Sequence, residues 1–176
     1  MRIIAGEFRS RVLKSLPGME TRPTPDRLRE TLFNVLAPEI EGAVFIDAYA
    51  GTGAVGIEAL SRGAARVIFI EKSRAAAAVI RENLSSLGLL SRAEVLQGKV
   101  LQYLSQRTAD IVFLDPPYGM EREYSEALET LGGRATRLVI AQHASRFKLA
   151  QSYGALELKR VIKHGDNSLS FYRPAV

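Results

Sequence analysis

A short apolar run that stops at two prolines sets the strongest limit on how this chain can fold. Residues 111–114 read Ile-Val-Phe-Leu, and Asp115, Pro116 and Pro117 follow directly. A partly β-branched run of this kind is typical of a strand buried in a parallel sheet. The strand must end before the prolines, because proline donates no hydrogen bond to a sheet ladder. We therefore expect Asp115 at the carboxyl end of a buried strand, where open α/β sheets bind their ligands.

The rest of the chain alternates between strand-like and helix-like patterns. Further apolar runs are typical of core strands, at residues 43–46, 66–70, 93–96 and 137–141. Residues 57–62 and 73–87 are typical of helices, and this alternation predicts a parallel sheet covered on both faces. Residues 156–162 and 168–172 alternate like a closing antiparallel pair. We predict an α/β fold, a three-layer sandwich whose mostly parallel, seven-stranded sheet ends in an antiparallel hairpin.

The start of the chain is basic and has a different pattern. Two short β-like pieces flank Gly6 and Glu7 within residues 2–16, which predicts a small β-hairpin. We predict that residues 1–20 form this basic N-terminal extension and that residues 21–176 form the main domain. An isolated hairpin is only marginally stable in water, so it should pack on the domain or on a ligand.

A proline-rich segment after the hairpin predicts the start of the first helix. Thr24 can cap that helix, with Pro25 at the first helical position. Apolar residues at helical spacing follow, and Pro38 and Gly42 are expected to end the helix. This pattern predicts an amphipathic helix laid against the sheet, but it does not explain the arginines near the helix start.

The composition excludes several kinds of site. The 176-residue chain has no cysteine, which excludes a disulfide and a thiolate nucleophile. His143 and His164 are its only histidines, which excludes a histidine-rich metal site, and no acidic cluster suggests magnesium, so we expect no metal. No apolar run is long enough to cross a membrane, and we expect a cytoplasmic protein. The net charge of +5 favours a polyanionic partner.

A glycine-rich loop follows the strand predicted at residues 43–46. Gly51, Gly53 and Gly56 match Gly-x-Gly-x-x-Gly, and Glu71 lies 20 residues after Gly51, at the end of the next strand. This pattern alone could bind a dinucleotide. Against a dinucleotide, the polar segment 47–50 separates the strand from the first glycine. The chain is also too short to add the substrate region of a dehydrogenase.

S-adenosylmethionine suits this loop better than a dinucleotide. The glycines let the backbone approach the methionine and ribose portions closely, and Asp47 can face the ammonium group. Glu71 can accept hydrogen bonds from both ribose hydroxyls. The predicted cofactor contacts are Asp47, Tyr49, Gly51, Gly53, Gly56, Glu71, Lys72, Gln97 and Asp115. The alternative is a close-packed strand–turn–helix without a ligand.

The segment Asp115-Pro116-Pro117-Tyr118 resembles the motif of methyltransferases that modify exocyclic amino groups of nucleobases. The resemblance implies that Asp115 and the Pro116 carbonyl accept the two N–H bonds of the target amine, and that Tyr118 stacks on the extruded base. The predicted catalytic residues are therefore Asp115, Pro116, Pro117 and Tyr118. The alternative is a strand-ending turn whose aspartate caps a helix and whose tyrosine packs.

The chain as a whole resembles the RsmD-type family of bacterial small-subunit ribosomal RNA guanine-N2 methyltransferases. The residues that carry the resemblance lie at 2–6, 22–34, 47–56, 58–64 and 115–118. The family implies a Rossmann-like class I methyltransferase fold, S-adenosylmethionine as cofactor, and methylation of one guanine in 16S rRNA of the small subunit or its precursor. We expect a monomer. Related enzymes carry an acid for the adenine amine where this chain has Gly98-Lys99, so we assign the adenine contact to Gln97 or to backbone.

The basic residues near the start of the chain are the predicted RNA contacts, because cationic side chains bind phosphates. They comprise Arg2, Arg9, Arg11, Lys14, Arg22, Arg27 and Arg29. The alternative is a solvated basic arm with no partner.

Two other functions use the same residues differently. An adenine-N6 methyltransferase acting on DNA or RNA would share the motif and the chemistry. A nonenzymatic RNA-binding protein could have kept the fold, although the intact acid, prolines, tyrosine and glycine loop argue against that.

Overall fold

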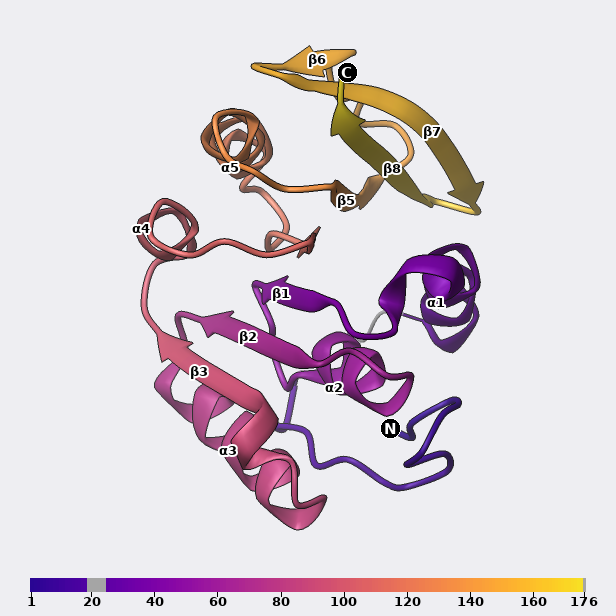
Figure 1. The fold of residues 1–176 in the computed structure, drawn as a ribbon, viewed down its shortest axis with the longest axis vertical. Helices are drawn as coiled ribbons and strands as arrows, with labels where there is room; N and C mark the ends of the chain where they lie inside the picture. The colour runs from indigo at the N-terminus through magenta and orange to yellow at the C-terminus, as the bar shows by residue number, and fades with distance from the viewer. Residues whose placement is uncertain (19–24, 176) are drawn as a thin grey trace.

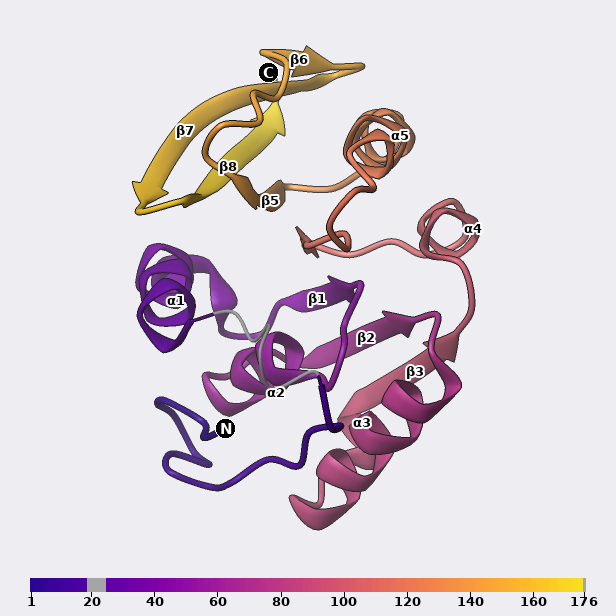
Figure 2. The ribbon, with the colours of Figure 1, turned by 180° about the vertical axis from the view of Figure 1, so that it is seen from behind.

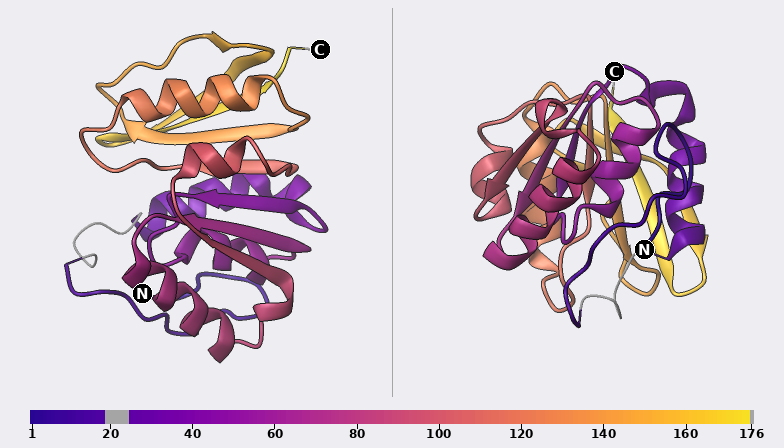
Figure 3. Two further views of the ribbon diagram at one scale, coloured as in Figure 1. Left: turned by 90° about the vertical axis from the view of Figure 1, so that its left-hand side faces the viewer. Right: turned by 90° about the horizontal axis from the view of Figure 1, so that it is seen from below.

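The computed structural model describes residues 1–18 and 25–175, and it confirms the predicted α/β architecture. One sheet has the strand order β3-β2-β1-β4-β5-β8-β7-β6 and runs from one end of the molecule to the other (Figures 1 and 3). The strands are β1 Val44–Ala48, β2 Arg66–Glu71, β3 Ala93–Gln97, β4 Ile111–Leu114, β5 Leu138–Ala144, β6 Ser152–Tyr153, β7 Leu156–His164 and β8 Asn167–Pro174. Strands β1 to β5 pair in parallel, and β8, β7 and β6 continue the sheet antiparallel.

The sheet has eight strands where seven were predicted. The additional strand, β6, is two residues long and pairs with Leu156 and Glu157 of β7. Two residues are too few to form a periodic pattern, so the sequence could not indicate it. The rest of the outer edge of β7, from Lys159 to His164, has no ladder partner on that side among the described strands.

Helices cover both faces of the sheet and so form the three layers. They are α1 Asp26–Ile40, α2 Ala54–Ser61, α3 Arg74–Ser86, α4 Val100–Leu104 and α5 Arg122–Gly132, with a 3-10 turn η1 at Leu90–Arg92. One buried cluster joins α1, α2 and α3 to residues such as Phe45, whereas another joins α4 and α5 to residues such as Ile46. Adjacent strand residues point to opposite faces, so β1 contributes to both cores.

The first helix differs from the prediction at both ends. It begins at Asp26, so Pro25 precedes it rather than opening it, and the predicted cap Thr24 lies outside the described residues. The helix passes through Pro38 and ends at Ile40. A proline near the end of a helix removes one backbone hydrogen bond, and burial of Leu36 and Ile40 holds this last turn against the core.

The two pieces that flank Gly6 and Glu7 pair antiparallel, as in the predicted hairpin, but the pairing is a single bridge between Arg2 and Val12 and not two full strands. Backbone hydrogen bonds from Ile3 N–H to the Arg11 carbonyl, at 3.0 Å, and from Leu13 N–H to the Met1 carbonyl, at 2.8 Å, flank the bridge. The expectation that this segment packs on the domain is confirmed: Ile3 and Leu13 are buried in the core shared by α1, α2 and α3. Figures 1 and 2 show the segment running beside α2 and α3. The boundary predicted at residue 20 lies outside the described residues and stays a prediction.

Within the described ranges, none of the helices is both long enough and apolar enough to cross a membrane.

Candidate active site

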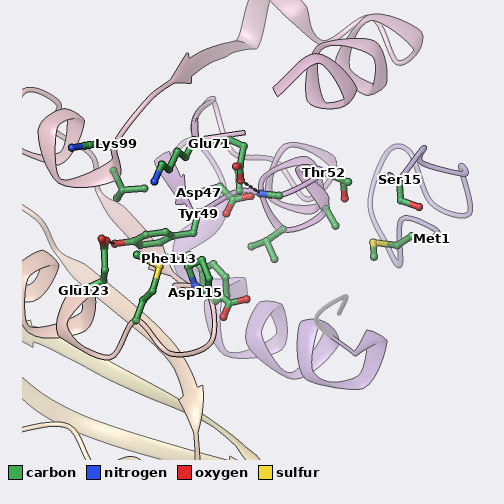
Figure 4. A pocket seen from close by; sticks show the side chains of 18 of the residues that line it. Met1, Ser15, Asp47, Tyr49, Thr52, Glu71, Lys99, Phe113, Asp115 and Glu123 are labelled. Atoms are coloured by element: carbon green, nitrogen blue, oxygen red, sulfur yellow. Dashed lines mark hydrogen bonds between the residues drawn. The ribbon is translucent and has the colours of Figure 1, made fainter. Parts of the chain in front are cut away.

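The carboxyl ends of the parallel strands border a cavity of about 980 Å³. Several residues predicted to bind the cofactor line it together (Figure 4): Asp47, Tyr49, Gly51, Glu71, Lys72 and Asp115. Met1 and Ser15 of the N-terminal segment line the cavity as well. The sequence therefore predicted the edge of the sheet and part of the polar lining, but not the contribution of the chain's first residues.

The glycine loop is closer to β1 than the sequence indicated, because the strand extends through Asp47 and Ala48. Gly51 and Gly53 have φ of 60° and 87°, a left-handed conformation that favours glycine. A Cβ on Gly56 would lie 2.3 Å from Cε1 of Phe69, so only glycine lets α2 pack so closely on β2. Gly53 and Gly56 therefore shape the loop and are not among the residues that line the cavity, and their contact with the cofactor stays a prediction.

The carboxylate of Asp47 lies at the floor of the site and is 2% exposed. Its Oδ2 accepts a hydrogen bond of 2.9 Å from the backbone N–H of Gly56. Burial raises the pKa of the Asp47 carboxyl well above its ordinary value, the Gly56 hydrogen bond lowers it, and the Asp115 and Glu71 charges raise it further. Three acidic side chains therefore act on one another here, which favours a ligand that carries positive charge.

Glu71, at the end of β2, holds the glycine loop in place. Its two carboxylate oxygens accept hydrogen bonds from the backbone N–H groups of Gly51, at 2.8 Å, and Ser73, at 2.7 Å. Each carboxylate oxygen can accept more than one hydrogen bond, so both retain capacity for ligand hydroxyls. Ser73 in turn caps α3 by accepting a hydrogen bond from Ala76 N–H.

Tyr49 and Glu123 form a polar contact that the sequence did not predict. Tyr49 has a φ of 60°, and its hydroxyl donates a hydrogen bond to the Glu123 carboxylate (Figure 4). Burial and the Glu123 carboxylate raise the pKa of the Tyr49 hydroxyl above its ordinary value. Glu123 lies on α5, 74 residues away, and only the amphipathic spacing of residues 122–132 could have indicated that helix.

The adenine contact was assigned to Gln97 or backbone, and the side chain of Gln97 is exposed and does not line the cavity. The turn after β3 lines it instead through Lys99, Val100 and Leu101. This wall of the cavity is therefore formed at the start of α4, and an adenine contact through Gln97 or backbone stays a prediction.

A second cavity, of about 280 Å³, lies on the other side of the Asp115–Tyr118 loop. Asp115 and Pro117 line both cavities, whereas Pro116 and Tyr118 line only the second. Tyr118 is 74% exposed. The loop therefore separates two spaces, and the carboxylate at its start borders each of them.

The predicted RNA contacts are spread over the N-terminal segment and α1. Arg2, Arg9, Arg11, Lys14 and Arg27 are exposed, and Arg22 lies outside the described residues. The segment that carries Arg9 and Arg11 lies against the ends of α2 and α3 that point away from the cavity: Glu7 N–H donates to the Ser61 carbonyl at 2.8 Å, and Arg11 Nη2 donates to the Ser86 carbonyl at 3.4 Å. An RNA bound by both arginines and by the cavity must therefore cover the length of α2.

Arg29 is not a surface residue, which corrects its prediction as an RNA contact. Its side chain is 0% exposed, and Nη2 donates to the Arg2 carbonyl at 2.6 Å. Its Nε lies 3.8 Å from Oε1 of Glu58, which is equally buried. Burial lowers the pKa of the Arg29 guanidinium, partly offset by the Glu58 carboxylate. Arg29 therefore joins α1 to α2 and to the N-terminal segment.

Across residues 1–18 and 25–175, no three histidine, aspartate or glutamate side chains gather closely enough to hold a metal ion.

Comparison with known proteins gives a consistent picture. The family model described as "Conserved hypothetical protein 95" matches residues 1–173. The chain is 42% identical to "Ribosomal RNA small subunit methyltransferase D" of Escherichia coli strain K12 over 144 residues, 80% of this chain and 72% of the relative. Its fold is similar to that of the solved yhhF protein of Escherichia coli, with a TM-score of 0.87, 32% identity and coverage of 100% and 98% of the two chains.

An RNA methyltransferase of Salinibacter ruber, solved in complex with S-adenosyl-L-homocysteine, shares the fold at a TM-score of 0.67 and 18% identity. That similarity covers 88% of this chain and 95% of the solved one.

Proposed function

Because the chain belongs to the RsmD-type family of small-subunit ribosomal RNA methyltransferases, we propose that it methylates the exocyclic N2 of one guanine in 16S rRNA, with S-adenosylmethionine as methyl donor. The observation that carries the proposal is the position of Asp115. This carboxylate borders both the large acidic cavity and the smaller cavity behind the proline loop. One cavity can hold the donor and the other the target base, with the reacting atoms meeting at Asp115.

The large cavity fits S-adenosylmethionine in charge and shape. Asp47, buried and acidic, suits the ammonium group, and Glu71 suits the ribose hydroxyls. Gly51 keeps the loop backbone close to the ligand, and Lys72 and Tyr49 complete the polar wall. When bound, S-adenosylmethionine supplies an electrophilic methyl group.

The proline loop suits an amine as the methyl acceptor. An exocyclic amine is a poor nucleophile, because its lone pair is delocalised into the aromatic ring. Hydrogen bonds from the two N–H groups to the Asp115 carboxylate and the Pro116 carbonyl hold the nitrogen in place and reduce that delocalisation. Positioning then supplies most of the rate, and Asp115 can accept a proton from the amine. The exposed ring of Tyr118 is available to stack on the extruded base.

The basic residues Arg2, Arg9, Arg11, Lys14 and Arg27, together with Arg22, are the proposed phosphate contacts. Their charge suits RNA of the small subunit or of an assembly precursor. We propose that the enzyme acts as a monomer in the cytoplasm and without a metal ion.

Nucleoside mass spectrometry tests the reaction. Small subunits from a strain that lacks this gene are incubated with the purified protein and S-adenosylmethionine, then digested to nucleosides. We expect a gain of N2-methylguanosine in 16S rRNA. A gain of N6-methyladenosine instead would replace the guanine assignment with the adenine alternative, and no methylated nucleoside would favour the nonenzymatic RNA-binding protein.

A further inference from the structure

One buried polar side chain lies beside Asp115 and has no role in the reaction described above. Gln142 lies on β5, directly after Ala141, and Ala141 pairs in parallel register with Leu114 of β4. The residues that follow this pair are Gln142 and Asp115, so the two stand side by side at the carboxyl edge of the sheet. Both line the smaller cavity.

The amide of Gln142 has an unused hydrogen-bond acceptor. The residue is 7% exposed, and its buried Oε1 accepts no hydrogen bond from any described group. Buried acceptors in proteins nearly always have a partner, because leaving one unpaired costs free energy. Gln142 lines the smaller cavity while its Oε1 is buried, so rotation of the side-chain amide would present this unpaired acceptor to a ligand that donates a hydrogen bond there.

Neighbouring groups hold this part of the wall of the smaller cavity in place, and none of those described below is a buried cation. The Gln142 carbonyl accepts a hydrogen bond of 2.5 Å from the Tyr124 hydroxyl. The ring of His143 contacts Ser170 Oγ at 2.7 Å and the Ala144 carbonyl at 2.9 Å, and burial lowers its pKa, which favours the neutral ring. Arg146, also in the lining, is exposed.

We propose that Gln142 distinguishes guanine from adenine by accepting the N1–H of the target guanine through Oε1, an inference that rests on the proposed function. In guanine the N2 amine is attached to C2, and the neighbouring ring atom N1 carries a hydrogen and donates a hydrogen bond. In adenine the ring atom beside the N6 amine, also N1, has no hydrogen and accepts. Oε1 of Gln142 can therefore accept a hydrogen bond from N1–H of guanine, whereas with adenine two acceptors, Oε1 and N1, would face each other.

Two substitutions separate hydrogen bonding from packing. Gln142→Met keeps the length of the side chain but removes the acceptor, and Gln142→Glu keeps an acceptor. Gln151→Met, at an exposed position, is the matched control. Each protein is assayed on small subunits with guanine, or with 2-aminopurine incorporated at the modified position found by mass spectrometry. The base analogue keeps the 2-amino group but has no hydrogen on N1.

The wild-type enzyme and Gln151→Met should prefer guanine over 2-aminopurine by tenfold or more in kcat/KM. Gln142→Met should lose most of this preference by losing activity on guanine, and Gln142→Glu should retain it. The affinity for S-adenosylhomocysteine, measured by calorimetry, should stay within about twofold for all variants, which shows that the cofactor site is intact.

Failure of this inference differs from failure of the proposed function. If the wild-type enzyme forms N2-methylguanosine but Gln142→Met keeps the full guanine preference, Gln142 does not read the base and the proposed function stands. If Gln142→Glu loses the preference as fully as Gln142→Met, hydrogen-bond acceptance is not its role. If the wild-type enzyme forms no N2-methylguanosine, both proposals fail.

Discussion

Asp47 shows at the scale of one residue how a binding site can reduce stability. Its carboxyl is buried, and among the described residues its Oδ2 accepts one hydrogen bond, from Gly56 N–H; burial raises its pKa well above the ordinary value. A carboxyl with a raised pKa in the folded state binds protons more tightly there than in the unfolded chain. The free energy of unfolding therefore falls as the pH rises from the unfolded pKa through the folded one.

We predict that Asp47→Asn raises the free energy of unfolding of the ligand-free protein at neutral pH and loses this advantage at acid pH. The same substitution should weaken the affinity for S-adenosylhomocysteine, because it removes the proposed partner of the ammonium group. Urea denaturation across a pH series, together with calorimetry, measures both effects. A variant that is less stable than wild type at neutral pH would contradict the account of Asp47.

Asp115 differs from Asp47 because it borders both cavities. We predict that Asp115→Ala lowers the rate of methyl transfer by at least 10²-fold, the size of effect that a positioned proton acceptor provides. Binding of S-adenosylhomocysteine should fall much less than the rate, because the carboxylate borders the cofactor cavity but its main role is assigned to the target amine. Single-turnover transfer and calorimetry on one preparation separate the two effects, and near-normal turnover would make Asp115 only a turn residue.

At the scale of elements, Glu58 joins the N-terminal segment to α2. Its carboxylate accepts hydrogen bonds from Ile4 N–H at 2.9 Å, Ala5 N–H at 3.0 Å and Arg62 Nε at 2.8 Å. It also faces the buried Arg29 guanidinium. The Glu58 side chain therefore provides a counter-charge to the buried Arg29 guanidinium and accepts hydrogen bonds from two backbone N–H groups.

We predict that Glu58→Gln lowers the free energy of unfolding by about 3–5 kcal/mol, because it leaves the buried Arg29 guanidinium with only the exposed Asp26 carboxylate, at 3.3 Å, as a described counter-charge. Glu82→Gln is the control, since Glu82 pairs with Lys14 through side chains that are 57% and 73% exposed, and solvent screens such a pair. Urea denaturation gives both values. Equal losses in the two variants would mean that the buried charge is compensated elsewhere.

At the scale of the whole molecule, the exposed cations define how the protein would lie on RNA. Arg9 and Arg11 lie on the segment that packs against the far ends of α2 and α3, so their contacts would extend the footprint along these helices. We predict that Arg9→Ala with Arg11→Ala weakens RNA binding and reduces the salt slope of log K by about one per phosphate contact removed. Filter binding of small-subunit RNA over a salt series measures the slope.

Arg137→Ala with Lys159→Ala is the matched control for that prediction. Both cations are already paired, Arg137 with Asp110 at 3.6 Å and Lys159 with Glu157 at 2.9 Å, so the slope should stay near that of wild type. An unchanged slope in the Arg9 and Arg11 variant would identify that segment as a solvated basic arm. The affinity for S-adenosylhomocysteine serves as a check on folding in both cases.

The parts of the structure that could be predicted are those that local pattern determines. Strand β4 was predicted to the residue, because its apolar run stops at prolines, and Asp115 follows from that. The burial of Arg29 could not be predicted, because it depends on Glu58 of another helix. Glu123 and Gln142 were missed for the same reason, since each acquires its place beside the site only when distant elements pack. The glycine loop lies between these cases: its position was predicted, but not which of its glycines line the cavity.

The unpaired edge of β7 has a consequence for the protein in a crowded cell. Between Lys159 and His164 the edge carries Arg160 and Lys163, and a register shift between Leu158 and Arg160 interrupts its ladder with β8. A second copy that approached to extend the sheet would bring the same positive charges against these and would meet an irregular strand. Charge and irregularity at this border thus oppose fibril-like growth from one copy to the next, even though the edge has free backbone groups. The same positive charges attract polyanions. The edge of β7 therefore opposes pairing with a second copy of the protein but is compatible with contact with RNA.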